Sequence, residues 1–318
     1  MRNDPPLLSI IIPHYNNAHH LPTCFKALRT QTYPRLEIIL ADNGSTDESL
    51  SLTRRDFPEV KIIEFGRNLG LAGAINRAIA QARGQVIIPL NNDTEVTPGW
   101  AEALVEMLQA HPEAGIVASK MLLFDRRDTL HSAGDGFGTN GIPLNRGVWQ
   151  QDRGQFDHDI YIFGGCGGAV AYRREMLADI GLFDEDLFMY LEDVDLNWRG
   201  QLAGYKAVFA PKAVVYHRLS ATGGGALASF YTGRNTLWVL AKDVPGAILR
   251  RHWRAIIRAQ LKITTESLRA WRGQAARARL RGQLAGLWGL PRWLARRGAI
   301  QRRKRVDDTY LESLLTHL

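Results

Sequence analysis

Four short groups of polar side chains each follow directly on an apolar run within the first 100 residues. They read PHYNN (13–17), DNGSTD (42–47), GRNLG (66–70) and NND (91–93). For any single group a turn or a helix cap is the simpler interpretation. An acid in such a place can also bind a divalent cation, and the cation can bridge two phosphate oxygens. Four such groups in succession are harder to explain by turns alone.

A second set of candidates lies further along the chain. The segment MYLEDVDLNWR (189–199) places Glu192, Asp193 and Asp195 at the start of a predicted helix, and His217 follows a strand-like run. Acids at a helix N-terminus complement the helix dipole, which explains their charge but not their density beside aromatic residues. An isolated histidine is more often a packed residue than a metal ligand, so the residue type alone leaves the role of His217 open.

These side chains need a scaffold that brings them together, and the first 120 residues predict one. Strands are expected at 7–12, 36–41, 60–65, 84–90 and 114–119, and helices at 18–31, 45–55, 70–82 and 98–110. The strands are continuously apolar, as in sheets covered on both faces. The alternation predicts an α/β fold with a mostly parallel central sheet flanked by helices, a Rossmann-like three-layer sandwich. Ligands bind beyond the carboxyl ends of such strands, which is where the four polar groups occur.

Two classes of phosphate-binding protein are excluded by missing glycine motifs. The segment PHYNNAHH (13–20) after the first strand contains no glycine, so the G-x-G-x-x-G turn of dinucleotide-binding proteins is absent. The chain also contains no G-x-x-x-x-G-K-[ST] phosphate loop. A sugar nucleotidyltransferase would share the fold class but should show a glycine-rich loop after the first strand. A bound phosphate must therefore be held in another way, and a cation on a strand-end acid is one.

Six segments, taken in order, carry a family resemblance. They are SIIIPHYN, ADNGSTDES, RNLGLAGAINRAIAQARG, LNNDTEVTPGW, GGCGGAVAYRREMLADIGLFDEDLFMYLEDVDLNWR and VVYHRLSATGG. In order and spacing they resemble family 2 glycosyltransferases of the GT-A fold, and most of all bacterial rhamnosyltransferases of cell-surface polysaccharide synthesis. The resemblance covers about residues 7–240. It predicts a GT-A domain at 1–240, with a nucleotide-sugar-binding half at 1–120 and an acceptor and catalytic half at 121–240.

The resemblance implies a divalent cation, Mn²⁺ or Mg²⁺, on the diphosphate of a nucleotide-sugar donor. Asp93 matches the last acid of the D-x-D motif that holds this cation, while Asn91 stands in place of the first acid. His217 matches a histidine that ligates metal in related family members. A nitrogen ligand beside one carboxylate favours Mn²⁺ somewhat over Mg²⁺.

The resemblance also assigns residues to the donor. Asp42 matches the acid that accepts from the N3 proton of uracil or thymine, and Pro13, Tyr15, Asn17 and Asp47 are expected around the same nucleoside. The residues expected at the ribose, the diphosphate and the donor sugar are Arg67, Asn68, Gly70, Asn76, Asn91 and Asn92. The N–H groups of the helix that begins near Gly70 can also point at phosphate. The favoured donor is dTDP-L-rhamnose, with a UDP-linked sugar left open.

For the second half, the resemblance makes Asp193 the catalytic base. It would take the proton of an acceptor hydroxyl in a single inverting displacement, and Glu192 would orient the acceptor. Glycines at 165–168 are expected to line the donor and acceptor pocket, with Cys166 as a small packed residue. The expected acceptor is a glycan or a polyprenyl-linked molecule. The alternative is a non-catalytic protein that binds sugar nucleotides or serves as a membrane-surface scaffold.

The C-terminal part has a different composition. Residues 245–306 contain 17 Lys or Arg and a single acid, so the positive net charge of the whole chain, +8, comes from this part, while residues 1–244 are mildly acidic. A basic amphipathic helical extension is predicted at 241–318, and a second, weaker helix around 280–294 should be interrupted at Pro291. The apolar stripe of the first helix is Leu249, Trp253, Ile257 and Leu261. An anionic membrane surface and packing on the catalytic body or in a dimer explain this stripe equally well.

Composition limits where the protein is expected to work. Cys24 and Cys166 match no disulfide or metal spacing, which is typical of reduced thiols in a cytosolic protein. The N-terminus is a poor signal peptide, and no stretch approaches the ~18 to 20 apolar residues of a membrane span. An acidic body without an RNA-binding motif argues against nucleic acid as a partner. The expected location is the cytoplasm, with attachment to the inner face of the plasma membrane as a further expectation; the oligomeric state is left open.

Overall fold

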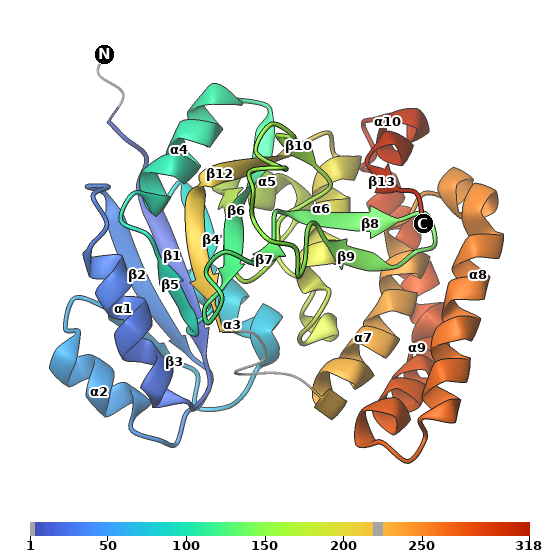
Figure 1. The fold of residues 1–318 in the computed structure, drawn as a ribbon, viewed down its shortest axis with the longest axis horizontal. Coiled ribbons are helices and arrows are strands. Elements are labelled where there is room, and N and C mark those ends of the chain that lie inside the picture. The colour runs from blue at the N-terminus through green and yellow to red at the C-terminus, as the bar shows by residue number, and fades with distance from the viewer. Residues whose placement is uncertain (1–3, 219–224) are drawn as a thin grey trace.

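The computed structural model of the chain describes residues 4–218 and 225–318. Figure 1 shows an α/β body that carries the N-terminus and a group of long helices at the opposite end of the molecule. The last six residues of the segment VVYHRLSATGG, 219–224, lie outside the described residues.

Four parallel strands form one half of the main sheet. In spatial order they are β3 (Lys61–Glu64), β2 (Leu36–Asp42), β1 (Leu8–His14) and β4 (Val86–Pro89). The helices between and after them are η1 (Ala18–His20), α1 (Leu21–Arg29), α2 (Ser49–Asp56), α3 (Gly70–Ile79) and α4 (Trp100–Ala110). The predicted alternation is therefore confirmed, and the carboxyl ends of the four strands lie at one edge of the sheet.

Alternate side chains of these strands enter two separate cores. Leu8, Ile10 and Ile12 of β1 belong to the core that contains residues of α1 and α4. Ile11 belongs to the opposite core, which contains residues of α3. Because helices cover both faces, apolar residues face both cores along the strand, which explains the nearly continuous apolar run; the buried Ser9 is an exception.

The second half of the body completes the sheet with strands of both directions. These are β5 (Thr94–Val96), β6 (Ala114–Leu123), β7 (Leu130–Ser132), β10 (Tyr161–Ile162), β11 (Val170–Arg173) and β12 (Lys206–His217). β11 lies antiparallel between β4 and β6, while β12 runs parallel to β6 and antiparallel to β5. Helices α5 (Arg174–Ile180), η2 (Glu185–Leu187) and α6 (Glu192–Leu202) pack beside them. The α/β fold with a mostly parallel central sheet is confirmed, and the antiparallel insertion of β11 is an addition to the prediction.

Three long helices follow: α7 (Gly225–Lys242), α8 (Gly246–Arg269) and α9 (Gln274–Gln301). α7 and α9 pack closely because glycines of α9 face α7; a Cβ atom at Gly282 would lie only 2.1 Å from the carbonyl oxygen of Phe230. Pro291 was predicted to interrupt the last of these helices, but α9 continues through it. A proline removes one helix hydrogen bond and bends a helix without necessarily ending it.

The C-terminal part is built into the body. α10 (Asp308–Ser313) is followed by β13 (Leu315–Thr316), which pairs with β8 (Asp135–Gly138) in a small sheet that also contains β9 (Pro143–Asn145). A third core joins Trp198 of α6 to Leu240 of α7 and Ile248 of α8. The domain boundary predicted at residue 240 lies inside α7, so the chain has no break there.

The amphipathic helix predicted after residue 245 is present as α8, but only the first residue of the predicted stripe packs on the body. Ile248, Leu249 and Ile256 contact the body, whereas Trp253, Ile257 and Leu261 are 51%, 48% and 58% exposed. Within the described ranges, no helix is both long and apolar enough to cross a bilayer.

Candidate active site

Asp93 and His217 lie side by side at the carboxyl edge of the sheet, although they are far apart in the chain. Nε2 of His217 is 3.2 Å from Oδ1 of Asp93, and both residues are buried. The pairing of β5 with β12 causes this contact, because its register sets His217 opposite Thr94, the residue after Asp93. A carboxylate beside an imidazole suits one divalent transition-metal cation, so the two residues fit the implied ion.

Asn91 and His131 complete the surroundings of His217. Nδ2 of Asn91 is 3.4 Å from Nε2 of His217, and Nδ1 of His131 on β7 is 3.1 Å from Nδ1 of His217. Burial lowers the pKa of His131 to about 3, so its ring is neutral. When Nδ1 of His217 donates to this ring, Nε2 keeps its lone pair for a cation, as metal-binding histidines usually require. His131 is not among the predicted site residues, because a single histidine in a three-residue strand has no distinctive spacing.

Asp42 ends β2 with only one of its carboxylate oxygens in use. Oδ2 accepts hydrogen bonds from the backbone N–H groups of Gly44 and Ser45, each at 3.1 Å. Oδ1 is buried, and no group among the described residues donates to it. A buried carboxylate oxygen without a donor is unfavourable, so a ligand N–H group would be stabilised here.

The loops after β1 and β2 are tied together by side-chain hydrogen bonds. The backbone N–H of Ala18 donates to Oδ2 of Asp47 at 3.0 Å, and the N–H of Thr46 donates to Oδ1 of Asn16 at 2.9 Å. Burial opposes ionisation of Asp47, but hydrogen bonds from Ser49 and Ala18 outweigh it and lower its pKa. Asp47 therefore acts as a structural link, which agrees with its expected place beside the nucleoside loop.

His14, at the end of β1, links the start of α2 to the loop after β4. Its Nε2 is 2.7 Å from Oγ of Ser49, and its Nδ1 is 2.7 Å from Nδ2 of Asn92. Burial lowers the pKa of His14 to about 4, so the ring is neutral; Nδ1 accepts from the Asn92 amide, and Nε2–H donates to Ser49. The side chain of Asn92 is thus used inside the protein. A polar residue at the end of a buried strand was a visible signal, but His14 was not assigned a role.

Four of the predicted nucleoside and diphosphate residues are open to a ligand. Pro13 and Asn17 are half-buried, while Tyr15 and Arg67 are exposed. Tyr15 and Asn17 flank the carboxyl end of β1, and Arg67 follows β3 at the same edge. The structure therefore brings them to one side of the sheet, as expected.

Asn68, Gly70 and Asn76 instead serve the packing of α3. The N–H of Gly70 donates to Oδ1 of Asn68 at 2.9 Å, and the N–H of Leu71 donates to the carbonyl of Phe188 at 2.7 Å. Nδ2 of Asn76 donates to the carbonyl of Phe183 at 2.9 Å. The first N–H groups of this helix are therefore already bonded within the protein, and the expected contact between them and phosphate is not supported.

Asp193 lies at the start of α6, facing the glycine-rich segment. Its Oδ2 accepts from the backbone N–H of Gly167 at 2.7 Å, and its Oδ1 accepts from the N–H of Val194 at 2.8 Å. A Cβ atom at position 167 would lie 2.9 Å from Oδ2 of Asp193, so a glycine is required for this close approach. The predicted glycine segment therefore positions the candidate base.

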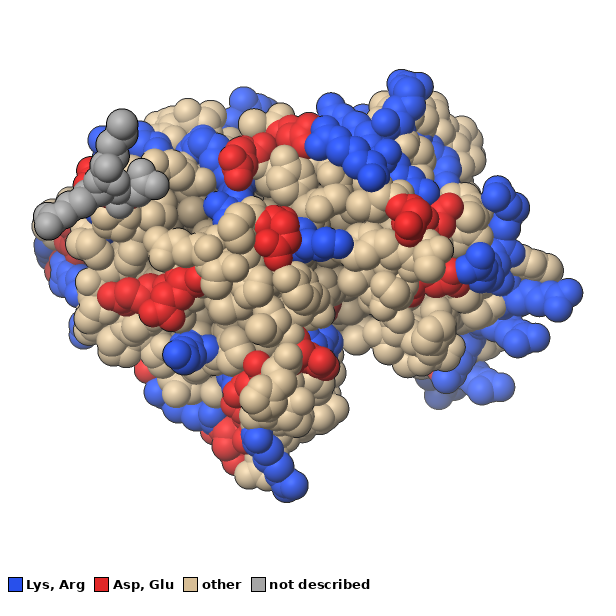
Figure 2. Space-filling view, turned by 90° about the horizontal axis from the view of Figure 1, so that it is seen from above, with Lys and Arg blue, Asp and Glu red and all other residues tan. Residues whose placement is uncertain are grey.

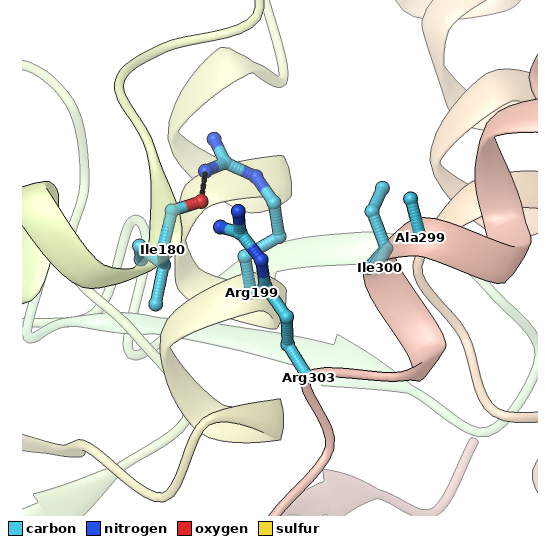
Figure 3. A pocket seen from close by; sticks show the side chains of 5 residues that line it. All are labelled: Ile180, Arg199, Ala299, Ile300 and Arg303. Atoms are coloured by element: carbon cyan, nitrogen blue, oxygen red, sulfur yellow. Dashed lines mark hydrogen bonds between the residues drawn. The ribbon is translucent and has the colours of Figure 1, made fainter.

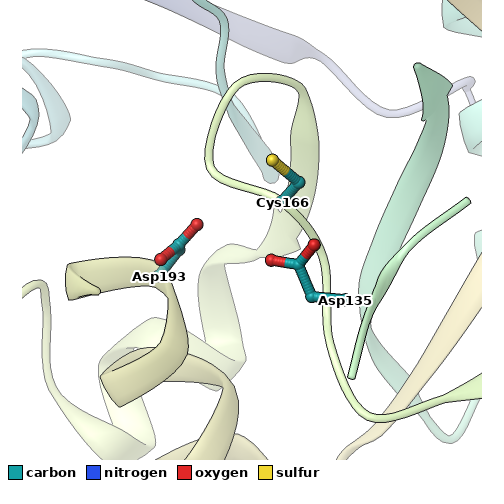
Figure 4. A group of neighbouring side chains, drawn as sticks. All are labelled: Asp135, Cys166 and Asp193. Carbon is teal, nitrogen blue, oxygen red and sulfur yellow. The ribbon is translucent and has the colours of Figure 1, made fainter. Parts of the chain in front are cut away.

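Several acids and one thiol share the surroundings of Asp193, as Figure 4 shows. Polar atoms of Asp135, Cys166 and Asp193 lie within 4.8 Å of one another. Burial raises the pKa of Asp193, and burial together with the nearby Asp193 carboxylate raises the pKa values of Glu192 and Asp135 well above the usual range. Burial also raises the pKa of the Cys166 thiol, which agrees with a packed residue rather than a nucleophile. A carboxylate with a raised pKa in this place is suited to accept a proton.

The loop before these acids is strained and is held by α7. Phe188, Tyr190 and Leu191 all have positive φ angles, of 65°, 64° and 65°. Nδ2 of the fully buried Asn235 lies 3.0 Å from the carbonyl oxygen of Met189 and 2.7 Å from that of Tyr190. The first of the C-terminal helices therefore fixes the approach to Asp193. Asn235 is not among the predicted site residues, because a polar residue in a helix is usually exposed and its sequence neighbours give no sign that it is buried.

Asp195 has a structural role, in contrast to its two acidic neighbours. Despite its burial, Arg199 and Lys242 hold the pKa of Asp195 well below its usual range, with Arg199 Nη2 at 2.6 Å from Oδ2. Arg199 also lines a cavity of about 210 Å³ between α9 and the body, with Ile180, Ala299, Ile300 and Arg303 (Figure 3). Its Nη1 donates to the carbonyl of Ile180 at 3.0 Å. This cavity belongs to the packing of α9 rather than to the strand-end site.

Comparison with known proteins agrees with this geometry. Residues 9–181 match the family described as Glycosyl transferase family 2. An N-acetylglucosaminyl-diphospho-decaprenol L-rhamnosyltransferase of Mycobacterium tuberculosis is 26% identical over 285 residues, which cover 80% of this chain and 89% of that protein. The O-antigen biosynthesis protein RfbC of Myxococcus xanthus is 30% identical over 231 residues, which cover 68% of this chain and 18% of that protein.

Two solved structures share the fold. GalNAc-T7 with UDP, GalNAc and Mn²⁺ has a TM-score of 0.61 and 20% identity, over 75% of this chain and 48% of that chain. The mannosyltransferase PcManGT from Pyrobaculum calidifontis, in complex with GDP-Man and Mn²⁺, has a TM-score of 0.56 and 19% identity, over 98% of this chain and 79% of that chain. The fold is therefore the GT-A fold of glycosyltransferases. The chain belongs to glycosyl transferase family 2, as the resemblance predicted, and is a glycosyltransferase.

Proposed function

We propose that the protein is a metal-dependent, inverting glycosyltransferase that moves a sugar from a nucleotide-diphosphate donor to a hydroxyl group of an acceptor. The contact of Asp93 with His217 at the edge of the sheet carries this proposal. It places a carboxylate and an imidazole together at the strand edge where Asp42 has a free buried oxygen. Mn²⁺ or Mg²⁺ bound by Asp93 and His217, with Asn91 beside them, would stabilise the negative charge of the departing diphosphate.

The uridine or thymidine part of the donor fits the carboxyl end of β2. Oδ1 of Asp42 is buried and would accept the N3 proton of either base, which supports a UDP or dTDP donor. Tyr15 is exposed beside it and offers a ring to the base. Asp47 and Asn16 tie together the two loops that form this pocket. Asn17 lies in the first of these loops, and Arg67 offers a cation near the diphosphate.

Asp193 acts as the base in the proposed reaction. One carboxylate oxygen takes the proton of the acceptor hydroxyl while the hydroxyl oxygen attacks the anomeric carbon and the bond from that carbon to the diphosphate breaks. The raised pKa of Asp193 makes it a stronger base than an exposed aspartate. Glu192, which is buried beside it, orients the acceptor.

The finer choice of substrates rests on the relatives. The Mycobacterium tuberculosis relative is named for transfer of L-rhamnose to a lipid-linked diphosphate sugar. We infer that dTDP-L-rhamnose is the favoured donor, with a UDP-linked sugar second, and that a glycan or a polyprenyl-linked sugar in cell-surface polysaccharide synthesis is the acceptor.

A panel of nucleotide sugars tests this function. The purified chain is incubated with dTDP-rhamnose and with UDP- and GDP-linked sugars, with Mn²⁺, with Mg²⁺ or with EDTA, and release of nucleoside diphosphate is measured. A UDP or dTDP donor should be consumed, and EDTA should stop the reaction. Binding of a donor without any turnover would favour the non-catalytic alternative, and neither binding nor turnover would remove the proposal.

We further infer that the exposed stripe of α8 associates with an anionic membrane surface. Trp253, Ile257 and Leu261 are exposed beside arginines of the same helix, and lipid phosphates attract such a face. Figure 2 shows Lys and Arg side chains gathered at the end of the molecule formed by the C-terminal helices.

The chain should therefore co-sediment with vesicles that contain phosphatidylglycerol and much less with pure phosphatidylcholine vesicles. The triple variant W253S/I257S/L261S should lose this binding while its nucleotide release stays unchanged. Equal sedimentation of the variant and the native chain would exclude this face as the membrane contact, and loss of a native dimer in the variant would assign the face to self-association.

A further inference from the structure

A cavity of about 460 Å³ lies where the C-terminal helices meet the catalytic body. Its walls come from the β8–β9 hairpin, from the loop before α6 and from all three long helices. The wall is mostly apolar, with Ile142 and Leu191 from the body and Ile263 from α8. The three helices therefore do more than cover the body, because together with it they border an open pocket large enough for part of a ligand.

One wall of this cavity comes from the loop that precedes the candidate base. Leu191 lines the cavity and is the residue before Glu192, where α6 begins, and Asp193 follows. Thr236 of α7 also lines it, one residue after the Asn235 that holds the loop at Tyr190. A ligand in the cavity would thus lie against the same short loop that positions Asp193.

Exposed apolar side chains lie next to one wall of the cavity in the chain. Ser267 of α8 and Ala270, the residue after its last turn, line the cavity, and their neighbours Leu268 and Trp271 are 55% and 61% exposed. The cavity therefore lies between a segment that carries exposed apolar side chains and the loop before the catalytic acids.

Arg279 brings into this lining a positive charge that no described residue pairs with. It is half-buried, burial lowers the pKa of its guanidinium, and no acid or carbonyl among the described residues accepts a hydrogen bond from it. The other charged residue of the lining, Glu266, is 58% exposed at its side chain and lies 4.0 Å from Lys262. A partly buried cation without a counter-charge is costly, and a bound anion would offset that cost.

We propose that this cavity binds a lipid-linked diphosphate acceptor. The diphosphate contacts Arg279, the hydrocarbon chain leaves toward Leu268 and Trp271, and the sugar extends past Leu191 toward Asp193. The apolar wall disfavours a free sugar or nucleotide, whereas the unpaired cation favours an anion, so the occupant is an amphiphile with an anionic head group. This inference rests on the proposed glycosyltransferase function and adds the place where the acceptor binds.

Binding of farnesyl diphosphate, a short-chain probe, tests the proposal on the full chain by isothermal titration calorimetry. Arg279→Gln should weaken binding about tenfold or more, as loss of a charged hydrogen bond does. The matched control is Arg281→Gln, an exposed arginine on the same helix, which should bind within about twofold of the native chain. Ala270→Trp, which narrows the outer opening without changing charge, should weaken binding as well.

Three competitor ligands show which part of farnesyl diphosphate the cavity recognises. Farnesol supplies only the chain and inorganic diphosphate only the head group, so each should bind more weakly than farnesyl diphosphate. Dihexanoyl phosphatidylglycerol should not displace the probe; displacement at equal concentration would mark an ordinary phospholipid site and overturn the proposal. Unchanged binding in both Arg279→Gln and Ala270→Trp would overturn it too.

Nucleotide release from the donor in the absence of acceptor, measured on the same preparations, distinguishes the two proposals. Release by the native chain without any binding of farnesyl diphosphate would overturn the acceptor site and leave the glycosyltransferase intact. Release by the native chain, together with weakened probe binding in Arg279→Gln, would support the acceptor site. No release by the native chain with any donor would overturn the proposed function itself.

Discussion

Replacing Asp193 with Asn should reduce sugar transfer by about 10²–10⁴-fold, the usual contribution of a general base. An amide has nearly the same shape as the carboxylate, so α6 and the glycine segment should remain in place. The amide cannot take the acceptor proton. Transfer to acceptor is measured by product formation, and donor binding by calorimetry with the nucleotide sugar, where the affinity should stay within about twofold of the native value.

The pH dependence gives a second check on Asp193. Below its pKa the carboxyl group is protonated and cannot accept a proton, so the transfer rate should fall as the pH falls through that pKa. Because the pKa of Asp193 is raised, this fall should begin at a higher pH than for an exposed aspartate. Asp159→Asn, the same change at an exposed acid, should alter neither the rate nor the profile. Loss of donor binding in Asp193→Asn would instead assign Asp193 to the donor site.

Removing either member of the Asp93–His217 pair should abolish metal-dependent donor binding. In Asp93→Asn or His217→Ala, the affinity for Mn²⁺ in the presence of UDP should fall at least about 100-fold, the upper limit of what loss of an outer-shell partner costs. Each variant leaves a single protein ligand of the pair, so the cation would be held mainly by the diphosphate. Mn²⁺ binding is measured by electron paramagnetic resonance, which does not depend on turnover.

Graded controls accompany this prediction. His131→Phe keeps both ligands but removes the partner of His217 Nδ1, so its Mn²⁺ affinity should fall about 10–100-fold. His158→Asn, at an exposed histidine, should bind Mn²⁺ like the native chain. Native Mn²⁺ affinity in both Asp93→Asn and His217→Ala would move the metal site elsewhere, and the cluster of Asp135 and Asp193 would be the next candidate.

Most of the N-terminal fold could be predicted from the sequence. The apolar pattern of each strand there matches the helices that cover both faces of the sheet. Helices cover both faces of β1, β2 and β4, so these strands are mostly apolar, with Ser9 and Glu37 as exceptions, and are easily distinguished from the polar residues that follow them. The insertion of β11 between β4 and β6 could not be predicted in this way. A four-residue strand after a glycine segment has no periodicity long enough to show its direction or its neighbours.

The candidate site was predictable to a similar degree. Asp42 and Asp93 stand at strand ends, and Asp193 at a helix start, so the residue types and their places were visible in the sequence. Resemblance to a family, and not spacing, suggested the role of His217. The roles of His131 and Asn235 could not be predicted from the sequence. Each acts through a contact with a distant segment, and the neighbouring residues in the chain do not indicate that contact.

In the C-terminal helices, the sequence pattern predicts that a helix forms but not which surface the helix packs against. The apolar repeat at every fourth residue predicted a helix, and α8 is that helix. The repeat did not reveal that the body contacts Ile248 and Ile256 while Trp253, Ile257 and Leu261 stay exposed. Which face of a helix is covered depends on the surface that meets it, and that surface is built from other parts of the chain.

By itself, therefore, the sequence determined the alternating strands and helices, the polar strand ends and the basic C-terminal helices, because these depend on neighbours within a few residues. Only the tertiary structure decided that Asp93 meets His217, that Asn235 of α7 holds the loop before Asp193, and that Arg279 faces a cavity beside Leu191. Each of these contacts follows from strand register or helix packing between distant segments, and such register is set by the whole core rather than by local pattern.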